Sequence, residues 1–467
     1  MNLVNYESSL ERVPKLFSFI VVRREYFGGY IFNHYHIDPL PMNEIGMGII
    51  ELSNGSKTIA EIINSLCSIF SLPFNILRTT VLNALDAFSQ YHAIKFLEEK
   101  IQVPKISSRQ LTIDNNISHR HLTAPLTVLW DITYACNLKC EHCLAAARNK
   151  LPNELTLLEV KNVIDQLSEM KVFNICFLGG EPLMRKDFIE ILEYATKSKI
   201  GISFSTNGIL INNQMIKALE KTDVFKAQVS LDGLEKTHNK IRGVNFSFQA
   251  VIQAIKKLTE SGIRVEVSTT VNKLNLLELD DLIQLSISLG AKSFKAIPFM
   301  PVGRGNNAKY LTLSPEEMKN YVTKIHYLKK KYGKQIFIHT EETYSWLLDK
   351  PPEPSIFDSY TKNLNCAAGT SQVVISSDGL VFPCPFLHNF IAGNLRNESF
   401  RQIWEESEIL LKFREIKRED LKGKCRECKY IPLRCKGGCR AAAYAHTGDF
   451  YAEDPLCWYK PKPLDQV

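Results

Sequence analysis

The sequence predicts an α/β protein built around a partial (β/α)6 barrel, with a small α+β domain before it and a cysteine-rich region after it. Three observations lead to this prediction. Short apolar runs alternate with amphipathic helical stretches six times between about 126 and 340. A hairpin pattern and three helical patterns occupy the first hundred residues. Seven cysteines lie between 366 and 457, where regular periodicity is weak.

The composition is that of a folded protein without membrane spans. The 467 residues are 45% hydrophobic and 23% charged, with a net charge of +7. This charge suits an acidic partner, but no run of Lys and Arg is dense enough to predict nucleic-acid binding. The start of the chain lacks the pattern of a secretion signal, and apolar stretches such as 17–22 are too short to span a bilayer. We therefore expect a cytoplasmic protein, in which thiols stay reduced and paired cysteines bind metals.

Residues 1–105 are predicted to form a separate small domain of winged-helix-like type. The segment 17–32 contains two β-branched and aromatic runs around Gly28-Gly29, which predicts a hairpin with its turn at the glycines. Helical patterns follow near 42–52, 58–70 and 74–92. Residues 106–125 are polar with little periodicity, and this predicts a linker.

Residues 126–345 are predicted to form the barrel, and 346–467 a separate C-terminal domain. The expected strands are 127–134, 174–179, 201–206, 225–231, 264–271 and 293–299. The expected helices are 156–171, 187–199, 212–222, 246–261, 278–290 and 314–332. Six repeats of strand and helix predict a parallel sheet, and right-handed crossovers would curl this sheet into a partial barrel.

A first cysteine cluster follows the first barrel strand directly. In TYACNLKCEHC, Cys136, Cys140 and Cys143 form a C-x3-C-x2-C array. Three thiolates on one loop can hold three irons of a [4Fe–4S] cube and leave the fourth iron open to a small molecule. Zinc is the alternative, but structural zinc sites favour C-x2-C pairs and four closed ligands. A C-x3-C step with no nearby fourth ligand fits zinc poorly.

The array resembles that of the radical S-adenosylmethionine (SAM) superfamily, and other motifs agree with this resemblance. FLGGEP (177–182), STNG (205–208) and VSLDG (229–233) each end a predicted strand, the edge where barrel enzymes build active sites. The resemblance implies a TIM-like radical SAM barrel whose loop cluster binds SAM. It further implies a set of SAM contacts: Gly179, Gly180 and Glu181 at the amino group, Ser205 and Asn207 after the third strand, Ser230 at the ribose, Arg242 at the carboxylate and His142 beside the adenine. No protein acid–base pair is predicted, and histidines such as His339 and His388 are expected to be surface or structural residues.

The second cysteine cluster resembles the SPASM extension, which carries two auxiliary iron–sulfur clusters. Cys366, Gly379 and Cys384 have C-x12-G-x4-C spacing, and a C-x2-C-x6-C-x3-C array and Cys457 follow. By resemblance the outer cluster is held by Cys425, Cys428, Cys435 and Cys457, and the inner one by Cys366, Cys384 and Cys439. The x6 step departs from the usual five residues. No cysteine follows Cys366 closely, so an open iron on the inner cluster is a hypothesis. A pair of zinc sites remains the alternative. Cys67 and Cys176 are expected to be small buried hydrophobes.

The N-terminal domain resembles the PqqD-like recognition element of enzymes that mature ribosomally made peptides. Such domains bind a leader peptide as an added strand, so that backbone hydrogen bonds supply much of the affinity. A tethered docking domain also raises the effective concentration of substrate near the barrel. A winged helix or a purely structural cap is the alternative for this segment.

Over residues 126–467 the chain resembles maturases that install thioethers from cysteine sulfur to an α-carbon, as in subtilosin-type sactipeptides. This resemblance implies a 5′-deoxyadenosyl radical that abstracts hydrogen from a precursor peptide. It also implies auxiliary clusters that accept an electron or anchor a thiolate, and an electron donor such as flavodoxin or ferredoxin. The alternatives are a carbon–carbon or other crosslink, sulfatase maturation, and a non-catalytic peptide chaperone carrying zinc.

Overall fold

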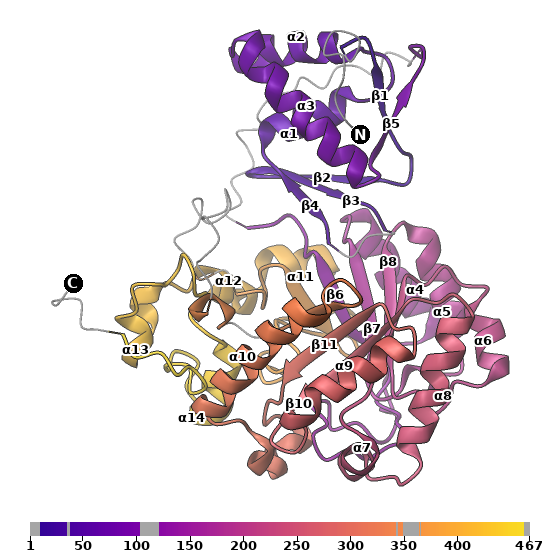
Figure 1. The fold of residues 1–467 in the computed structure, drawn as a ribbon, viewed down its shortest axis with the longest axis vertical. Helices are drawn as coiled ribbons and strands as arrows, with labels where there is room; N and C mark the ends of the chain where they lie inside the picture. Colours follow the sequence, from indigo (N-terminus) through magenta and orange to yellow (C-terminus); the bar gives the residue numbers. More distant parts are fainter. Residues whose placement is uncertain are drawn as a thin grey trace. The chain divides into compact units, whose positions relative to one another are not determined.

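A computed structural model describes residues 10–34, 38–102, 121–341, 344–348, 364 and 366–461. The chain divides into two compact units, 1–123 and 124–467 (Figure 1). Most of the predicted linker lies outside the described residues, and so do residues 349–363, just after the predicted domain boundary at 346. No described helix combines the length and the apolar character that crossing a membrane requires.

The N-terminal unit contains two small antiparallel sheets and three helices. The strands are β1 (Val13–Leu16), β2 (Val21–Glu25), β3 (Gly28–Phe32), β4 (Leu40–Met42) and β5 (Ile94–Leu97). The helices are α1 (Glu44–Leu52), α2 (Ile59–Phe70) and α3 (Phe74–Gln90). The three predicted helices are confirmed. The pairing of β1 with β5 was not predicted, because it joins segments about eighty residues apart in the chain.

The predicted hairpin is present, but its turn is not where the glycines lie. Gly28 pairs with Glu25 and Gly29 with Arg24, so the turn residues are Tyr26 and Phe27. The glycines belong to β3, where Gly28 has φ +131° and a Cβ would lie 2.3 Å from the carbonyl oxygen of Met42. The expected Gly-Gly turn was therefore wrong: β4 approaches Gly28 closely, and a Cβ on Gly29 would lie 2.3 Å from the carbonyl oxygen of Arg23 in β2.

The C-terminal unit contains the predicted barrel. Its parallel strands are β6 (Thr127–Asp131), β7 (Asn174–Leu178), β8 (Gly201–Thr206), β9 (Lys226–Ser230), β10 (Val265–Val271) and β11 (Ser293–Pro298), in sequential order. The connecting helices are α4 (Leu157–Glu169), α5 (Phe188–Ala195), α6 (Asn213–Leu219), α7 (Glu235–Arg242), α8 (Ser247–Glu260), α9 (Leu279–Ser288) and α10 (Pro315–Tyr332). All six predicted strands and six predicted helices are confirmed. Helix α7 is an addition that the sequence pattern did not reveal.

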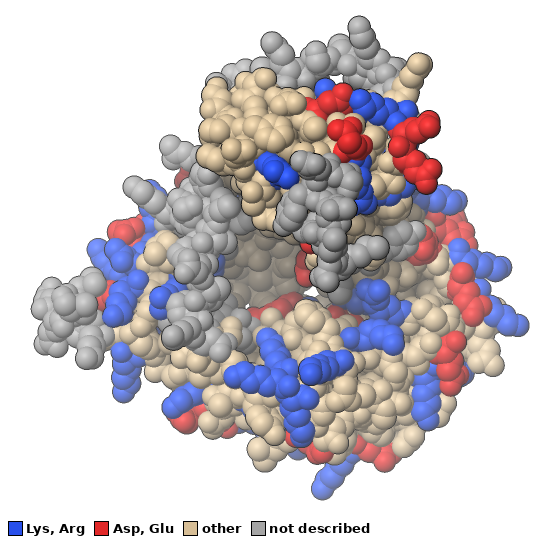
Figure 2. Space-filling view, turned by 45° about the horizontal axis from the view of Figure 1, so that its top comes forward, with Lys and Arg blue, Asp and Glu red and all other residues tan. Residues whose placement is uncertain are grey.

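The barrel sheet continues into the cysteine-rich region. Strand β12 (Phe337–Thr340) extends one edge of the sheet, while β13 (Gln372–Ile375) pairs in parallel with β6 at the other. Strands β14 (Leu380–Phe382) and β15 (Gly393–Asn394) complete a ten-stranded sheet. The remaining helices are α11 (Phe400–Glu406), α12 (Glu408–Glu415), α13 (Gly423–Arg426) and α14 (Arg440–Thr447). Figure 2 shows small groups of Lys and Arg side chains among uncharged and acidic ones.

The two faces of the barrel sheet differ in chemistry. On one face, Phe177 of β7 and Phe204 of β8 both pack edge-on against Phe188 of α5, so this face is the apolar core beneath the helices. On the other face the strands present partly exposed polar residues, including Ser203 and Gln228. Barrel interiors are usually filled by branched apolar side chains. A polar, partly open interior therefore indicates a binding surface.

Candidate metal and cofactor site

The first cysteine loop is fastened to the segment that follows β7. The backbone N–H of Gly180 donates to the carbonyl of Thr133 at 2.7 Å, and that of Glu181 donates to Ala135 at 2.8 Å. A Cβ on Gly180 would lie 2.1 Å from the Ala135 oxygen. The Gly-Gly-Glu segment therefore needs glycine because the loop that carries Cys136 lies directly against its backbone.

The Glu181 side chain is fully buried and links the ends of two strands. Its carboxylate accepts hydrogen bonds from the Thr206 hydroxyl at 2.9 Å and the Asn207 backbone N–H at 2.7 Å. Burial raises the pKa of Glu181 to about 7, although these hydrogen bonds favour the ionised form. The Asn207 amide donates to Asn137 on the cysteine loop at 2.7 Å. The predicted SAM-contact segments after β7 and β8 thus meet beside the cysteines, and their contacts to SAM stay a prediction.

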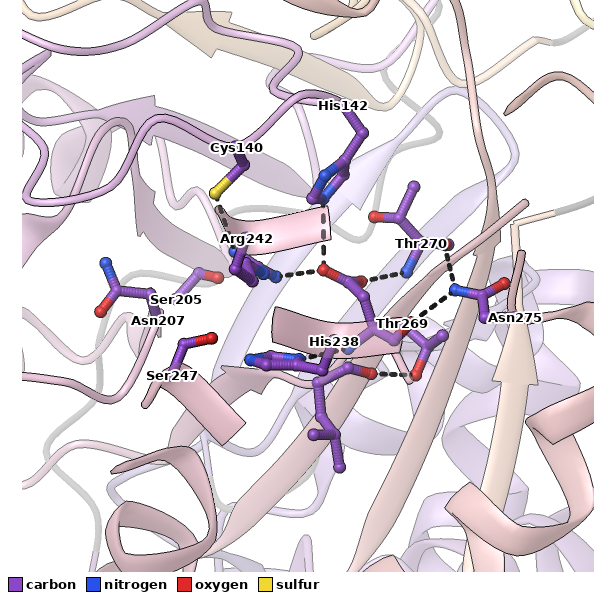
Figure 3. A network of polar contacts seen from close by, with 12 residues as sticks. Cys140, His142, Ser205, Asn207, His238, Arg242, Ser247, Thr269, Thr270 and Asn275 are labelled. Atoms are coloured by element: carbon purple, nitrogen blue, oxygen red, sulfur yellow. Dashed lines mark hydrogen bonds and ion pairs between the residues drawn. The ribbon is translucent and has the colours of Figure 1, made fainter. Parts of the chain in front are cut away.

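A buried ion-pair network joins the cysteine loop to the end of β9 (Figure 3). Arg242, on α7, forms an ion pair with the Asp232 carboxylate at 2.6 Å and donates to the Cys140 sulfur at 3.7 Å. His142 contacts the same Asp232 oxygen at 3.3 Å. Burial alone would raise the pKa of Asp232, but Arg242 and His142 hold it well below its usual range. Arg242 is therefore engaged by the protein, and its predicted role at the SAM carboxylate stays a prediction.

Asp232 itself is a site residue that the sequence reasoning missed. Its other oxygen accepts the Thr270 backbone N–H at 2.9 Å, and its own backbone N–H donates to Nδ1 of His238 at 3.1 Å. Burial lowers the pKa of His238 to about 3, and the charge of Arg242 acts in the same direction, so the ring is neutral and can accept. The Asp-Gly after β9 and the spacing of His238 and Arg242, four residues apart on one helix face, could have indicated this network.

Arg304 is a second residue that was missed. It follows β11 in a short 3₁₀ segment, Gly303–Leu311. Its guanidinium donates to the backbone carbonyls of Cys140 and Ala147, both at 2.8 Å. Its backbone N–H donates to the backbone carbonyl of Cys143. A Cβ on Gly303 would lie 2.0 Å from the carbonyl oxygen of Leu144. The Gly-Arg-Gly at the end of the last predicted barrel strand was the available indication.

The barrel interior carries a connected set of charges opposite the cysteine loop. Glu266 on β10 is buried and bonds His339 of β12 at 2.6 Å and Lys226 of β9 at 2.9 Å. Burial would raise the pKa of Glu266, but these two partners lower it to about 2. The strand register places one row of polar side chains at the level of the predicted ribose contact: Ser230, Ser268, Lys295 and His339. The His339 side chain is 30% exposed and lies in the polar interior of the barrel. The His388 ring stacks on Phe382.

The first cysteine set, Cys136, Cys140 and Cys143, suits a metal cluster that offers hydrogen-bond acceptors to the donors beside it. All twelve cysteines are free thiols. Burial raises the pKa of Cys136 to about 11 and also that of Cys140, where the Arg242 charge opposes it, so metal binding is needed to hold these sulfurs as thiolates. The buried Nε of Arg242 and Nδ1 of His142 have no hydrogen-bond partner. The Arg242 Nε is a donor left over beside a thiol set, which is what an anionic cofactor requires.

The second cysteine set forms a cavity in the C-terminal region. This pocket is partly open, has about 330 Å³ of empty space including space open to solvent, and is lined by the four cysteines predicted for the outer cluster, Cys425, Cys428, Cys435 and Cys457. The backbone N–H groups of Arg434 and Cys435 both donate to the carbonyl of Tyr430, so the extra residue of the x6 step is absorbed in a closed turn. Among the described residues, no three His, Cys, Asp or Glu side chains converge on one point as a single ion requires.

The three predicted inner ligands lie next to this cavity in one buried cluster. Cys366, Cys384 and Cys439 pack around the same apolar core. Burial is the main cause that raises the pKa of Cys384, and the neighbouring Cys439 and Cys366 raise it further. Buried Asp454 connects the two sets, because it accepts the backbone N–H of Cys439 at 2.7 Å and that of Leu456, next to Cys457, at 2.9 Å. The assignment of ligands to individual clusters stays a prediction.

The fold and these sites define an iron–sulfur enzyme that uses SAM. Residues 130–285 match the radical SAM superfamily, and residues 366–429 match an iron–sulfur cluster-binding domain, SPASM. The chain is 34% identical over 349 residues to an AdoMet-dependent heme synthase of Methanosarcina barkeri, covering 72% of this chain and 97% of that protein. It is 32% identical to mycofactocin maturase MftC of Mycobacterium tuberculosis, covering 72% and 84%. The chain belongs to the radical SAM superfamily.

One solved structure shares the fold of nearly the whole chain. SuiB of Streptococcus suis, bound to S-adenosylmethionine, covers 95% of this chain and 100% of its own with a TM-score of 0.71 and 20% identity. A structure of anSMEcpe with bound AdoMet covers 71% of this chain with a TM-score of 0.57 and 22% identity. These likenesses show the fold. The predicted radical SAM barrel with a C-terminal SPASM domain is confirmed.

Buried carboxylates give the C-terminal unit a pH-dependent stability. Burial raises the pKa of Asp131 from 3.8 to about 7. The folded state therefore holds more protons than the unfolded state between about pH 4 and 7, and stability falls as the pH rises through this window. We expect Asp131→Asn to flatten that slope in denaturant unfolding measured at pH 5 and 7.5. Asp165→Asn, at an exposed site, should keep it; an unchanged slope in Asp131→Asn would contradict the assignment.

Proposed function

We propose that the chain matures a ribosomally synthesised precursor peptide by installing an intramolecular thioether from a cysteine sulfur to an α-carbon. One observation carries the proposal. The fold of SuiB covers 96% of this chain in the structure bound to precursor peptide SuiA, with a TM-score of 0.71, so the likeness includes the N-terminal unit as well as the barrel. The 32% identical MftC proteins are also named maturases.

The chain's own residues have distinct tasks in this proposal. Cys136, Cys140 and Cys143 hold the loop cluster, which when bound supplies the electron that splits SAM into methionine and a 5′-deoxyadenosyl radical. The Asp232–Arg242 pair fixes the loop against the end of β9. The row of polar side chains on β9–β12, Ser230, Ser268, Lys295 and His339, would face the substrate. The predicted outer and inner cysteine sets hold the auxiliary clusters that accept an electron or a substrate thiolate.

For the N-terminal unit we propose leader-peptide docking of the PqqD-like kind. Among the described strands, the sheet order is β2-β3-β4, so β2 and β4 are its outer strands. A leader that adds as a further strand would gain backbone hydrogen bonds with little demand on its sequence. The tether to the barrel unit would then raise the effective concentration of the core peptide. Flavodoxin or ferredoxin is the proposed electron donor.

Gly28→Ala tests the docking role. The added Cβ would meet the Met42 oxygen at 2.3 Å, and φ is +131°, so we expect the hairpin to lose its pairing with β4. Leader binding, measured by fluorescence anisotropy, should weaken by at least about tenfold, roughly 1.4 kcal/mol. SAM cleavage without peptide should continue. Asn83→Ala, at an exposed position of α3 in the same unit, should retain binding. Normal leader binding by Gly28→Ala would argue against this docking surface.

Co-expression with a short cysteine-bearing precursor peptide, sought among the reading frames beside the gene, tests the proposed bond. Each thioether removes two hydrogens and blocks one cysteine from alkylation, and mass spectrometry reads both changes. A carbon–carbon crosslink removes the same two hydrogens but leaves the thiol alkylatable. A peptide that loses hydrogens while every cysteine stays alkylatable would therefore overturn the thioether and favour that alternative.

Heme formation is a second candidate function. It is favoured by the 34% identity to AdoMet-dependent heme synthase and by a 32% identical Fe-coproporphyrin III synthase of the same organism. An anaerobic assay with Fe-coproporphyrin III, followed by its absorption spectrum, distinguishes the two. Heme formed without any requirement for the N-terminal hairpin would favour this candidate. Protein that contains zinc and yields no 5′-deoxyadenosine would instead support a non-catalytic peptide chaperone.

A further inference from the structure

A basic segment surrounds the predicted outer cysteine set. Residues 422–436 contain six Lys or Arg residues and one acid, Glu427, so this segment carries a net charge of +5 in a chain whose total is +7. The segment includes α13, which lies at an edge of the C-terminal unit (Figure 1). It also supplies three of the four predicted outer ligands, Cys425, Cys428 and Cys435. The net positive charge of the chain is therefore concentrated around the predicted outer centre.

Three exposed cations of this segment form no ion pair with a carboxylate of the described residues. They are Arg426, Lys429 and Arg434, and each is adjacent in sequence to a predicted outer ligand. We call these three side chains the outer basic patch. Lys422 differs from them, because it pairs with Asp449 at 2.7 Å. Uncompensated surface charges of one sign attract a partner of the opposite sign and speed its association.

Two tyrosines connect the outer basic patch to the pocket of the outer cysteines. Lys429 Nζ lies 5.6 Å and Arg434 Cζ 5.4 Å from the ring centroid of Tyr430. The Tyr430 ring packs edge-on against Tyr459 at 5.3 Å, and Tyr459 lines the partly open pocket together with the four outer cysteines. A protein docked on this patch would therefore contact side chains that pack against the wall of the outer centre.

An exposed leucine lies within the outer basic patch. Leu433 is 53% exposed and directly precedes Arg434. The backbone N–H of Arg434 donates to the Tyr430 carbonyl at 2.8 Å, so Leu433 lies in a closed turn. An apolar residue among charged ones is the pattern of a protein interface, and the interfaces of electron-transfer partners are small. A small interface suits a partner that must bind, exchange an electron and leave.

We propose that the outer basic patch docks a small acidic one-electron carrier protein, of flavodoxin or ferredoxin type, which takes electrons from the outer auxiliary centre. The charge of the patch selects an acidic partner, and its place around a predicted redox centre selects an electron carrier. In each transfer the reduced centre loses one electron and the oxidised carrier gains it, and no bond forms or breaks. The inference rests on the outer ligand set in the proposed function, but not on the bond formed in the peptide.

Stopped-flow electron transfer tests the docking surface. The reconstituted full-length chain, with alanine at the three cysteines of the first set, is reduced, freed of reductant and mixed with oxidised flavodoxin or ferredoxin. A variant without the patch charges should transfer electrons about tenfold more slowly at low salt. The difference should shrink at high salt, because screening shortens the reach of the charges. This variant combines Arg426→Gln, Lys429→Gln and Arg434→Gln.

The matched control removes three exposed lysines from the side of the C-terminal unit where α6 and α8 lie, opposite α13 (Figure 1). Lys217→Gln, Lys221→Gln and Lys256→Gln together lower the net charge by the same amount. Their transfer rate should stay close to that of the parent. If this control slows transfer as much as the patch variant does, only net charge matters and the proposal is overturned.

Leu433→Ala tests whether the carrier docks or is merely attracted by charge. Loss of the apolar contact should weaken carrier binding, measured by calorimetry on the reconstituted full-length chain, by about threefold or more at low and at high salt. Leu277→Ala is the control, because Leu277 is 84% exposed and lies outside the patch. Equal binding by Leu433→Ala and the parent would contradict a docked complex at this site.

Transfer rates are normalised to auxiliary iron, so that a loss of cluster is not mistaken for a loss of docking. A normalised rate of the patch variant equal to that of the parent, or a parent that reduces neither carrier, would overturn the proposal. So would a patch variant that keeps transfer but no longer binds the leader peptide. Parent protein without outer iron contradicts the ligand assignment and this proposal together. An unaltered chain that binds the carrier but makes no peptide product contradicts only the proposed reaction.

Discussion

Cys140→Ala is expected to abolish reductive cleavage of SAM. Changing groups that merely surround a metal site commonly costs about 10- to 100-fold, so removing one of three proposed ligands should reduce 5′-deoxyadenosine formation by more than about 100-fold. The change also removes the sulfur that Arg242 contacts at 3.7 Å. The assay is chromatography of 5′-deoxyadenosine after anaerobic incubation with SAM and reductant.

Cys67→Ala is the control for Cys140→Ala. Cys67 lies in α2 of the N-terminal unit and packs against its apolar core. We expect this variant to retain cleavage and the full iron content. Iron should fall in Cys140→Ala by the share of one cluster, while the auxiliary centres remain. Near-normal cleavage by Cys140→Ala would remove the basis for placing the SAM-binding cluster on this loop.

Asp232→Ala is expected to give the largest loss of stability in the barrel. It leaves the buried Arg242 and His142 without the carboxylate that both contact. Breaking a buried pair by removing one partner typically costs about 3–5 kcal/mol, because the remaining charge is uncompensated. Denaturant unfolding of the C-terminal unit measures the loss, and we expect the cysteine loop to bind its cluster less tightly as well.

Two further substitutions serve as comparisons for the stability loss expected in Asp232→Ala. Asp232→Asn keeps the shape but removes the charge, so it should fall between Ala and the parent. Asp280→Ala breaks a partly exposed pair with Lys331, for which about 0–1 kcal/mol is expected. A loss below about 1 kcal/mol in Asp232→Ala would mean that Arg242 finds another partner and that the network does not hold the loop.

The elements of the barrel were predictable because each follows from local pattern. Buried parallel strands are apolar runs bounded by turns, and their helices carry one apolar face, so six strands and six helices were placed within a few residues of their ends. The cysteine arrays were equally readable, because ligand spacing on a short loop is a sequence property. The Gly28-Gly29 turn was misplaced because glycine is common in turns, whereas here the backbones of β4 and β2 approach Gly28 and Gly29, respectively, too closely for a side chain.

What escaped prediction depends on residues far apart in the chain. The pairing of β13 with β6 joins segments about 245 residues apart, and it makes the cysteine-rich region part of the barrel sheet. Arg304 donates to the backbone carbonyl of Cys140, which lies 164 residues earlier in the sequence. No local pattern records such contacts, since the order of strands in a sheet and the partners of a buried charge are set when the layers pack.

Composition, periodicity and cysteine spacing were enough to predict an α/β barrel, its strands and helices, and the thiols that suit iron. Which charge stands beside which thiol was settled by packing. Asp232 forms an ion pair with Arg242. The Arg440 guanidinium donates to backbone carbonyls and pairs with no carboxylate among the described residues. Electrostatic partnership falls off over a few ångströms. Those distances exist only once β9, α7, α14 and the cysteine loops have been brought together by the burial of their apolar neighbours.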